Sequence, residues 1–267
     1  MARFNRLLLT GAAGNLGRQL RTGLRHLTER YRLTDIAQID GVEPHEEAVQ
    51  CDLGDELQVR ALLQEVDAVL HFGGIAGESN FGEIANANIH GLYNLYEGCR
   101  RNNVKRVIFA SSNHAIGFYP RGQTIDGDVT HRPDTLYGVS KAFGENISRY
   151  FFDKYEIETV CLRIGSCFPK PIDRRMLATW LSYPDLLRLV ESALLAPVVG
   201  HMICYGVSNN REMLWDNRTA SSIGYQPQDC AEDYRAEVEA ITENPEPTDD
   251  AVRYQGGGYT VLRHEDF

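Results

Sequence analysis

The chain has 267 residues and carries 37 acidic against 27 basic side chains, a formal net charge of −10. Its hydrophobic fraction of 43% and charged fraction of 24% are ordinary for a globular protein, which excludes disorder as the main state. The negative balance argues against a sequence-neutral nucleic-acid binder and against a basic membrane-surface anchor, because both need a positive footprint. An anionic small molecule is still allowed, since one arginine in a pocket can outweigh a distant negative surface.

Targeting and metal signals are weak. We expect no signal peptide and no membrane span, because the longest apolar stretch, residues 186–199, is interrupted by Arg188 and Glu191. Six cysteines are scattered without a C-x-x-C pair, which predicts reduced thiols in a cytoplasmic protein. The histidines form no H-x-x-x-H or Cys/His cluster, so no metal site is predicted.

Short apolar runs alternate with segments of helical periodicity along the first part of the chain. In chain order we predict strands over 6–10, 31–35, 48–51, 66–72, 104–110 and 157–164, and helices over 16–27, 55–64, 86–99 and 134–154. This alternation is typical of an α/β protein of Rossmann type, with a doubly wound parallel sheet and helices on both faces. Such sheets bind ligands beyond the carboxyl ends of their strands.

The alternation fades after the sixth predicted strand. A helix over 183–195, a strand near 201–205 and a helix over 228–242 are still predicted. No internal repeat or low-complexity linker is present. We therefore expect a single domain over 1–267, in which residues 1–165 form the core and residues 166–267 form mainly a small C-terminal cap and tail.

A glycine-rich turn with the pattern T-G-x-x-G-x-x-G joins the first strand to the first helix. Gly11 permits the tight turn, Gly14 lets the backbone approach a pyrophosphate, and Gly17 lets the helix pack closely on the sheet. The strand–turn–helix setting therefore predicts a dinucleotide site. The alternative is a glycine-rich turn that holds no ligand.

Two aspartates follow the next two predicted strands. Asp35 lies 18 residues after Gly17, where a carboxylate can accept hydrogen bonds from the adenosine ribose and would repel a 2′-phosphate. No arginine follows it directly, so NAD is favoured over NADP. Asp52 could address the adenine amino group in the same way, although either aspartate could simply hold a turn.

Tyr137 and Lys141 lie four residues apart on the predicted long helix and therefore share one face. An ammonium beside a phenol favours the phenolate by on the order of 4 kcal/mol at about 4 Å and an effective dielectric near 20. Such a tyrosine can act as a base on an alcohol at neutral pH. The spacing is common by chance, but Ser111 and Ser112 close the fifth strand at the edge where the cofactor is expected.

Together and in this order, these motifs resemble those of the extended short-chain dehydrogenase/reductases over nearly the whole chain. The resemblance implies that Tyr137 is the catalytic base, that Lys141 lowers its pKa and binds the nicotinamide ribose, and that Ser112 orients the substrate hydroxyl. It places NAD on residues 1–165 and the substrate on the cap. The NAD contacts that it implies are Gly11, Gly14, Asn15, Leu16, Gly17, Asp35, Asp52, Leu53, Phe72, Gly73, Gly74, Asn88, Tyr137 and Lys141, with Asn88 equally readable as an ordinary helix residue.

Within this family the chain is similar to the NAD-dependent members that oxidise free hexuronic acids. The similarity lies in segments 111–120, 136–141, 163–167, 175–180 and 252–257. It implies oxidation of the anomeric carbon of cyclic D-galacturonate or D-glucuronate to an aldarolactone, with formation of NADH. Only about 100 residues follow the sixth strand, which leaves little room for a nucleotide-linked sugar.

The same similarity implies the substrate contacts, which are Ala76, Ser112, Asn113, His114, Tyr137, Ser166 and Arg175. Arg175 would clamp the sugar carboxylate, for which its planar fork is suited, while its neighbour Arg174 would be solvated. Asn113, His114 and Ser166 would bind ring hydroxyls, although Asn113 and His114 could instead serve their loop. Ala76 stands where the family can carry a serine, so one hydroxyl contact is expected to be missing.

Two other functions stay open at this point. A nucleotide-sugar epimerase or dehydratase of the same family would keep the serine, tyrosine and lysine but use a larger cap. An NAD-sensing regulator without chemistry typically lacks the tyrosine or the lysine. As partners we expect a small sugar acid, neither nucleic acid nor membrane, and further copies of the chain, which could pair through the Tyr93/Tyr96 face or the long helix.

Overall fold

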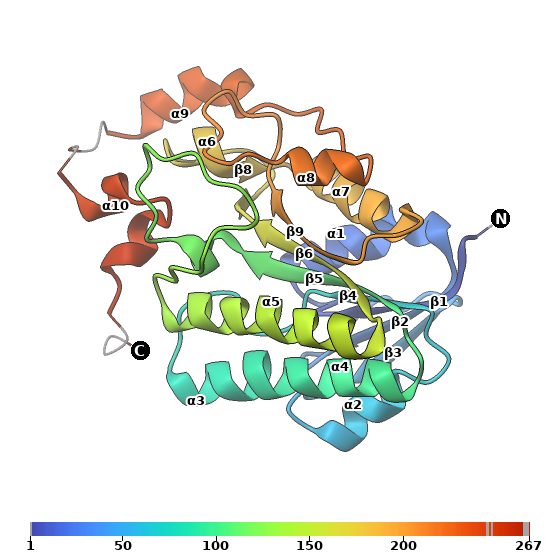
Figure 1. Ribbon diagram of the computed structural model, residues 1–267. Coiled ribbons are helices and arrows are strands. Elements are labelled where there is room, and N and C mark those ends of the chain that lie inside the picture. Colours follow the sequence, from blue (N-terminus) through green and yellow to red (C-terminus); the bar gives the residue numbers. More distant parts are fainter. Residues whose placement is uncertain (1, 244–245, 247, 264–266) are drawn as a thin grey trace.

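Figure 1 shows the protein as a computed structural model, which describes residues 2–243, 246, 248–263 and 267. Seven strands form one sheet in the order β3-β2-β1-β4-β5-β6-β9, and every neighbouring pair is parallel. The order reverses between β1 and β4, which is where ligands bind in such sheets. The strands are β1 (Phe4–Thr10), β2 (Thr28–Asp35), β3 (Glu46–Gln50), β4 (Ala68–His71), β5 (Arg106–Ser112), β6 (Glu158–Ile164) and β9 (His201–Gly206).

Helices cover both faces of this sheet (Figure 1). One face carries α1 (Asn15–Gly23) and α7 (Tyr183–Leu195), and the other carries α2 (Glu56–Leu62), α4 (Gly91–Arg101) and α5 (Leu136–Tyr155). An apolar cluster fills each interface, with Leu20 and Leu186 in the first and Val59, Leu95 and Phe151 in the second. The predicted doubly wound Rossmann-type sheet is thereby confirmed.

The start of α5 places the residues of the central motif. Thr135 caps the helix by accepting a hydrogen bond from the Gly138 amide at 3.0 Å, so the helix begins at Leu136. Tyr137 therefore lies in the first turn and Lys141 in the second. Both side chains are buried, with 7% of each exposed, on the side of α5 that faces β5.

The remaining elements are shorter. They are η1 (Arg25–Leu27), α3 (Phe81–Ile84), the π-helix η2 (Ala85–His90), η3 (Asn113–Ile116), β7 (Ser166–Cys167), α6 (Met176–Thr179), β8 (Trp180–Leu181), α8 (Arg218–Ser222), η4 (Ala231–Tyr234), α9 (Arg235–Ile241), α10 (Asp250–Arg253) and η5 (Gly257–Val261). β7 and β8 pair as a separate parallel ribbon.

Three predicted helices differ from the observed ones. The first ends at Gly23 and continues as η1, the helix over 86–99 begins as the π-helix η2, and the helix over 228–242 divides into η4 and α9. The segment after residue 165 also contributes to the sheet layers, because β9 pairs with β6 and α7 packs beside α1. The sheet therefore contains strands from the expected core, residues 1–165, and from the expected cap, residues 166–267.

Several expectations about the whole chain can be compared with the structure. All six cysteines are free, and Cys51, Cys99, Cys161 and Cys204 are buried. Within the described ranges, no helix combines the length and apolarity needed to cross a membrane, and no group of side chains is suited to hold a metal ion. Of the two tyrosines predicted to form a surface for pairing with another copy, Tyr96 is excluded, because its ring is fully buried.

Candidate active site

A cavity of about 1130 Å³ lies at the carboxyl ends of β1, β2, β4, β5 and β6. Small-molecule pockets commonly measure about 300–1,000 Å³, so this cavity has room for an extended ligand and a second small molecule. Every predicted site residue lines it except Asn88. By strand order, the glycine loop and Asp35 lie on the β1–β2 side, and Ser112 and Tyr137 lie on the β5 side.

The glycine loop has the geometry of a phosphate cradle. Gly11 has a φ of +71°, and a Cβ there would lie 2.5 Å from the carbonyl oxygen of Phe72. A Cβ on Gly17 would lie 2.0 Å from the carbonyl oxygen of Gly11, so the loop and α1 can approach only without side chains. Gly14 precedes α1 without a side-chain cap, and the first turn holds no acidic residue. The helix start therefore suits an anionic ligand such as a pyrophosphate.

The two predicted aspartates both line the cavity and hold turns. Asp35 accepts hydrogen bonds from the amides of Ala13 and Ala37, both at 3.0 Å, and so connects the glycine loop to the end of β2. Asp52 accepts from the Gly54 amide at 2.8 Å and from the Asn86 side chain at 3.4 Å. Each aspartate therefore holds a turn and also lines the cavity, so the turn role and the predicted cofactor-binding role do not exclude each other.

The turn after β4 contributes Phe72, Gly73, Gly74 and Ala76 to the cavity wall, beside Leu53 of the turn after β3. Asn88 of the π-helix η2 holds this turn: its Oδ1 accepts from the Ile75 amide at 2.8 Å and its Nδ2 donates to the Ile75 carbonyl at 3.0 Å. Its Nδ2 also donates to Ser140 Oγ of α5 at 2.9 Å. Asn88 thus lies behind the wall instead of on it.

Ser112, Tyr137 and Lys141 meet at the end of β5. Ser112 Oγ accepts a hydrogen bond from the His114 amide at 3.1 Å, which leaves its own hydrogen free to point toward Tyr137 and the cavity. Lys141 Nζ donates to the Ala110 carbonyl oxygen at 2.8 Å and lies 5.4 Å from the centroid of the Tyr137 ring. The three side chains therefore lie close together at the edge of the sheet where the cofactor is expected.

Burial shifts the protonation of this group. Burial raises the pKa of Tyr137 to about 12, although a hydrogen bond with Ser112 opposes the rise. Burial also lowers the pKa of Lys141 to about 8. Burial therefore outweighs any opposing effect on the ionisation of Tyr137, and the prediction that Lys141 favours its phenolate stays a prediction.

His114 is held in place from two sides. Its Nδ1 lies 2.8 Å from Oδ2 of Asp134, whose side chain is fully buried. Its ring stacks on Tyr259 with centroids 3.9 Å apart, and Tyr259 also lines the cavity. Because an ionised Asp134 can only accept, Nδ1 of His114 donates, and in the neutral ring Nε2 is left as an acceptor.

Arg175 reaches the cavity from the loop before α6. Its Nε and Nη2 donate to the Gln255 carbonyl oxygen at 3.0 and 2.9 Å, and its Nη1 donates to Ser166 Oγ at 3.1 Å. With the Asn113 amide in the orientation that satisfies both of its neighbours, its oxygen accepts from Nη2 at 2.6 Å and its nitrogen donates to the Ile164 carbonyl. All of these acceptors are neutral.

The charge of this guanidinium is not balanced by a direct ion pair. Within the part of the chain that the structure describes, no carboxylate oxygen lies within 4.0 Å of Arg175. Burial lowers its pKa, although the more distant charges of Asp173 and Asp134 oppose this. Arg174, in contrast, points to the surface, where it pairs with Glu239 at 3.5 Å. The arrangement matches the predicted choice of Arg175 over Arg174.

Sequence reasoning missed three residues that shape the site. Tyr259 and Asp134 hold His114, and Glu78 accepts hydrogen bonds from the amides of Leu136 and Tyr137 at 3.1 and 2.8 Å. Glu78 thereby fixes the first turn of α5. The sequence offers a weak signal only for Tyr259, which directly follows the glycine run of the similar 252–257 segment.

A glycine cradle, a Tyr–Lys pair and a serine at the carboxyl edge of a parallel sheet define a dinucleotide-dependent enzyme of the short-chain dehydrogenase class. The chain belongs to the NAD dependent epimerase/dehydratase family, whose family model matches residues 7–182.

Known relatives agree with this class over nearly the full length. The uronate dehydrogenase of Pseudomonas syringae pv. tomato is 54% identical over 97% of this chain and 94% of its own. That of Agrobacterium fabrum is 47% identical over 95% of this chain and 96% of its own. The crystal structure of glucuronic acid dehydrogenase from Chromohalobacter salexigens, at 47% identity, superposes with a TM-score of 0.96 over 98% of both chains. A variant of the uronate dehydrogenase from Agrobacterium tumefaciens, complexed with NAD, gives 0.95 at 46% identity over 98% of both chains.

Proposed function

We propose that the protein oxidises the anomeric carbon of cyclic hexuronic acids, D-galacturonate and D-glucuronate, to aldarolactones, with NAD as the hydride acceptor. The observation that carries this proposal is Arg175, a guanidinium with neutral partners in the same cavity as Tyr137 and Ser112. A carboxylate is the group that such a planar cation binds best. The similarity to uronate and glucuronic acid dehydrogenases points to the same substrate class.

The cradle around the glycine loop fits NAD. Gly11, Gly14 and Gly17, with Asn15 and Leu16 at the start of α1, would hold the pyrophosphate, and Asp35 would accept hydrogen bonds from the adenosine ribose. When bound, NAD supplies the hydride acceptor and a positive charge that favours the phenolate form of a nearby tyrosine. The carboxylate of Asp35 would disfavour the additional phosphate of NADP.

Tyr137 and Ser112 act on the C1 hydroxyl of the sugar. The C1–H bond breaks with its electron pair, the hydroxyl proton passes to the Tyr137 phenolate, and the C1–O bond becomes the lactone carbonyl. Ser112 donates a hydrogen bond to the same oxygen, since the His114 amide occupies one of its lone pairs and leaves its hydrogen free. The Lys141 ammonium stabilises the phenolate through space and is itself held by Ala110.

The remaining polar side chains select the sugar. Nε2 of His114 accepts from a ring hydroxyl, because Asp134 holds its other nitrogen as a donor. Asn113 and Ser166 lie beside Arg175, where they would bind ring hydroxyls near the sugar carboxylate. Ala76 lines the cavity without a hydroxyl, so it contributes shape only. A sugar that leaves these buried groups unpaired loses about 1–3 kcal/mol for each.

The test is NADH formation at 340 nm with D-galacturonate, D-glucuronate, the neutral sugars D-galactose and D-glucose, and a UDP-sugar. We expect turnover of the hexuronates alone. Arg175→Ala should raise KM for the hexuronates about 30- to 1,000-fold, since truncating one partner of a buried charge pair costs about 2–4 kcal/mol. Arg174→Ala is the matched control, because it removes the neighbouring guanidinium outside the cavity.

Two outcomes would contradict the proposal. An unchanged KM in Arg175→Ala would remove the carboxylate clamp. Tight NAD retention with conversion of the UDP-sugar and no net NADH would instead indicate an epimerase.

We also propose that the enzyme acts in the cytoplasm as a homo-oligomer, without nucleic acid or membrane partners. The free cysteines support a reducing compartment. Tyr93 on α4 and Tyr150 on α5 expose 48% and 50% of their surface and offer aromatic area for a second copy. Light scattering should give a multiple of the 30.0 kDa chain mass, and a mass of 30.0 kDa would contradict an oligomer.

A further inference from the structure

The side chain of Gln255 is an unusually well-held amide in the C-terminal part of the chain. Only 1% of its surface is exposed. Its Nε2 donates to the carbonyl oxygens of Pro120 and Gln123 at 3.1 and 2.8 Å, and its Oε1 accepts from Trp215 Nε1 at 2.8 Å. Its backbone amide donates to the Tyr119 carbonyl at 2.9 Å. These four hydrogen bonds fix the position of residue 255 from both its backbone and its side chain.

The carbonyl oxygen of the same residue holds Arg175. It accepts from Nε at 3.0 Å and from Nη2 at 2.9 Å, which makes it the acceptor of two of the guanidinium's hydrogen bonds. Gly257 packs so closely that a Cβ there would lie 2.4 Å from Cδ of Arg175. The Arg175 side chain is therefore positioned by the backbone of this segment, and the segment is positioned by Gln255.

Trp215 connects Gln255 to the core beneath the reaction site. Its ring stacks on Tyr205 with centroids 4.7 Å apart and planes 3° apart. The Tyr205 hydroxyl donates to the Asp126 carbonyl at 2.8 Å and accepts from Nη1 of Arg163 at 3.3 Å. The indole N–H of Trp215 takes no part in these contacts and donates to Gln255.

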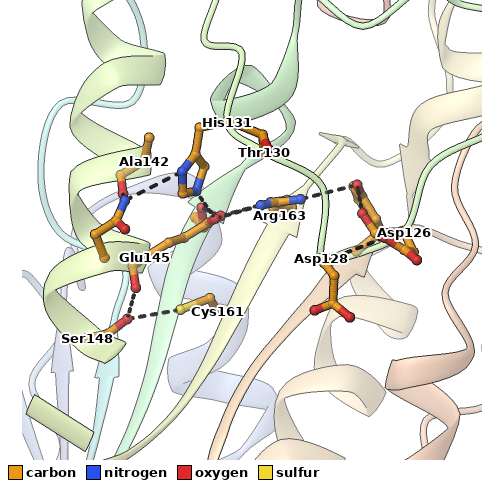
Figure 2. Close-up of polar contacts among 12 residues, drawn as sticks. Asp126, Asp128, Thr130, His131, Ala142, Glu145, Ser148, Cys161 and Arg163 are labelled. Carbon is orange, nitrogen blue, oxygen red and sulfur yellow. Dashed lines mark hydrogen bonds and ion pairs between the residues drawn. The ribbon is translucent and has the colours of Figure 1, made fainter. Parts of the chain in front are cut away.

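The far end of these contacts is a buried ion pair between α5 and β6, shown in Figure 2 between His131 on one side and Asp126 on the other. Arg163 donates to both oxygens of Glu145, at 3.0 and 2.8 Å, and each side chain is 1% exposed. Glu145 also accepts from Ser111 Oγ at 2.6 Å and lies one helical turn after Lys141. The contacts thus run continuously from beside the Ser–Tyr–Lys group to the carbonyl that holds Arg175.

We propose that Gln255 is a positioning residue for the sugar carboxylate, acting through its carbonyl oxygen on Arg175. The proposal rests on the proposed function, in which Arg175 binds that carboxylate. A free arginine side chain loses considerable rotamer entropy when it binds a ligand, so a guanidinium that is already held in place binds more tightly. Loss of the Gln255 side-chain bonds releases the carbonyl and therefore weakens substrate binding, while the groups that carry out the chemistry stay in place.

A double-mutant cycle tests this inference. Gln255→Met keeps the length of the side chain and removes its three hydrogen bonds. We expect KM for D-galacturonate to rise about tenfold, equivalent to about 1.4 kcal/mol, with kcat changed less than about threefold and the Kd of NAD unchanged. In the Arg175→Ala background the same change should alter KM less than about twofold, because coupled residues lose their joint effect when one is absent. The Kd of D-galacturonate in the abortive complex with NADH, followed by NADH fluorescence, gives the same comparison without turnover.

A second pair of variants distinguishes the loss of the Gln255 contact from a general destabilisation of the fold. Trp215→Phe removes only the indole N–H bond to Gln255 and keeps the ring on Tyr205, so KM should rise about threefold. Trp180→Phe is the matched control, since this buried indole donates to the Phe168 carbonyl at 2.9 Å and not to Gln255. Its KM should not change.

Three results would overturn the inference. These are equal effects of Gln255→Met with and without Arg175, an unchanged KM in Gln255→Met, and equal effects of the two tryptophan changes. If the wild-type enzyme shows no preference for hexuronates over neutral sugars, the proposed function itself fails, and this result is distinct from all three.

Discussion

The contribution of Lys141 to catalysis can be estimated from the structure. Its Nζ lies 5.4 Å from the centroid of the Tyr137 ring. At that distance and an effective dielectric near 20, the ammonium stabilises the phenolate by about 3 kcal/mol, equivalent to about two pKa units. Burial already raises the pKa of Tyr137 to about 12, so the phenolate is a minor form at neutral pH. Lys141→Met should therefore reduce the phenolate fraction about 100-fold and lower kcat by the same factor.

The assay is kcat for D-galacturonate at saturating NAD across about pH 6 to 7, where the phenol stays below its pKa and Lys141 stays charged. C1-deuterated substrate establishes that hydride transfer limits the rate. Lys154→Met is the matched control, because Lys154 is exposed near the end of the same helix. Its kcat should equal that of the wild type.

A kcat for Lys141→Met within about threefold of the wild type over this pH range would refute the reasoning. It would mean that the ammonium does not control the ionisation of Tyr137. A loss confined to KM for NAD would point to a cofactor-binding role alone.

Three further predictions concern neighbouring groups. Asp134→Ala removes the acceptor that fixes the His114 ring, so kcat/KM for both hexuronates should fall about tenfold or more, and an unchanged value would exclude this role. Lys141→Met should raise the free energy of unfolding at pH 7 by about 3 kcal/mol, because burial lowers the pKa of this lysine to about 8 and the charged form costs stability. Wild-type stability then rises between pH 8 and 10.5, so urea denaturation should show this gain shrinking as pH increases through that window, and a constant gain would contradict it. Asp35→Ser should raise the ratio of kcat/KM with NADP to that with NAD about tenfold, and an unchanged ratio would show that Asp35 does not repel the additional phosphate.

The fold could be predicted largely because local patterns and global packing agree. Leu7, Leu8 and Leu9 are fully buried in β1, as a continuous apolar run in a parallel strand requires. The predicted bounds of the helix over 183–195 coincide with α7, since Ser182 caps its start. The helix over 86–99 could be placed but not its π-helical beginning, because the contacts of Asn88 with the turn after β4 come from tertiary structure.

The candidate site could be predicted where a motif lies within one strand or helix. Ser112, Tyr137 and Lys141 needed only the ends of β5 and α5 to converge. Tyr259 and His114 are 145 residues apart, and no local pattern predicts that their rings stack. The pKa of Tyr137 also depends on burial, which the helical spacing of Tyr137 and Lys141 does not reveal. Contacts between distant segments and loss of hydration are therefore the physical information that the sequence pattern lacks.

The central claim is that the Tyr137 hydroxyl accepts the proton of the sugar's C1 hydroxyl. The most direct measurement is kcat of Tyr137→Phe for D-galacturonate with NAD, together with the Kd of NAD. Because the phenylalanine ring keeps the packing and removes only the base, kcat should fall about 100- to 10,000-fold while the Kd of NAD changes little. Oxidation of hexuronates at the wild-type rate by Tyr137→Phe would contradict the account.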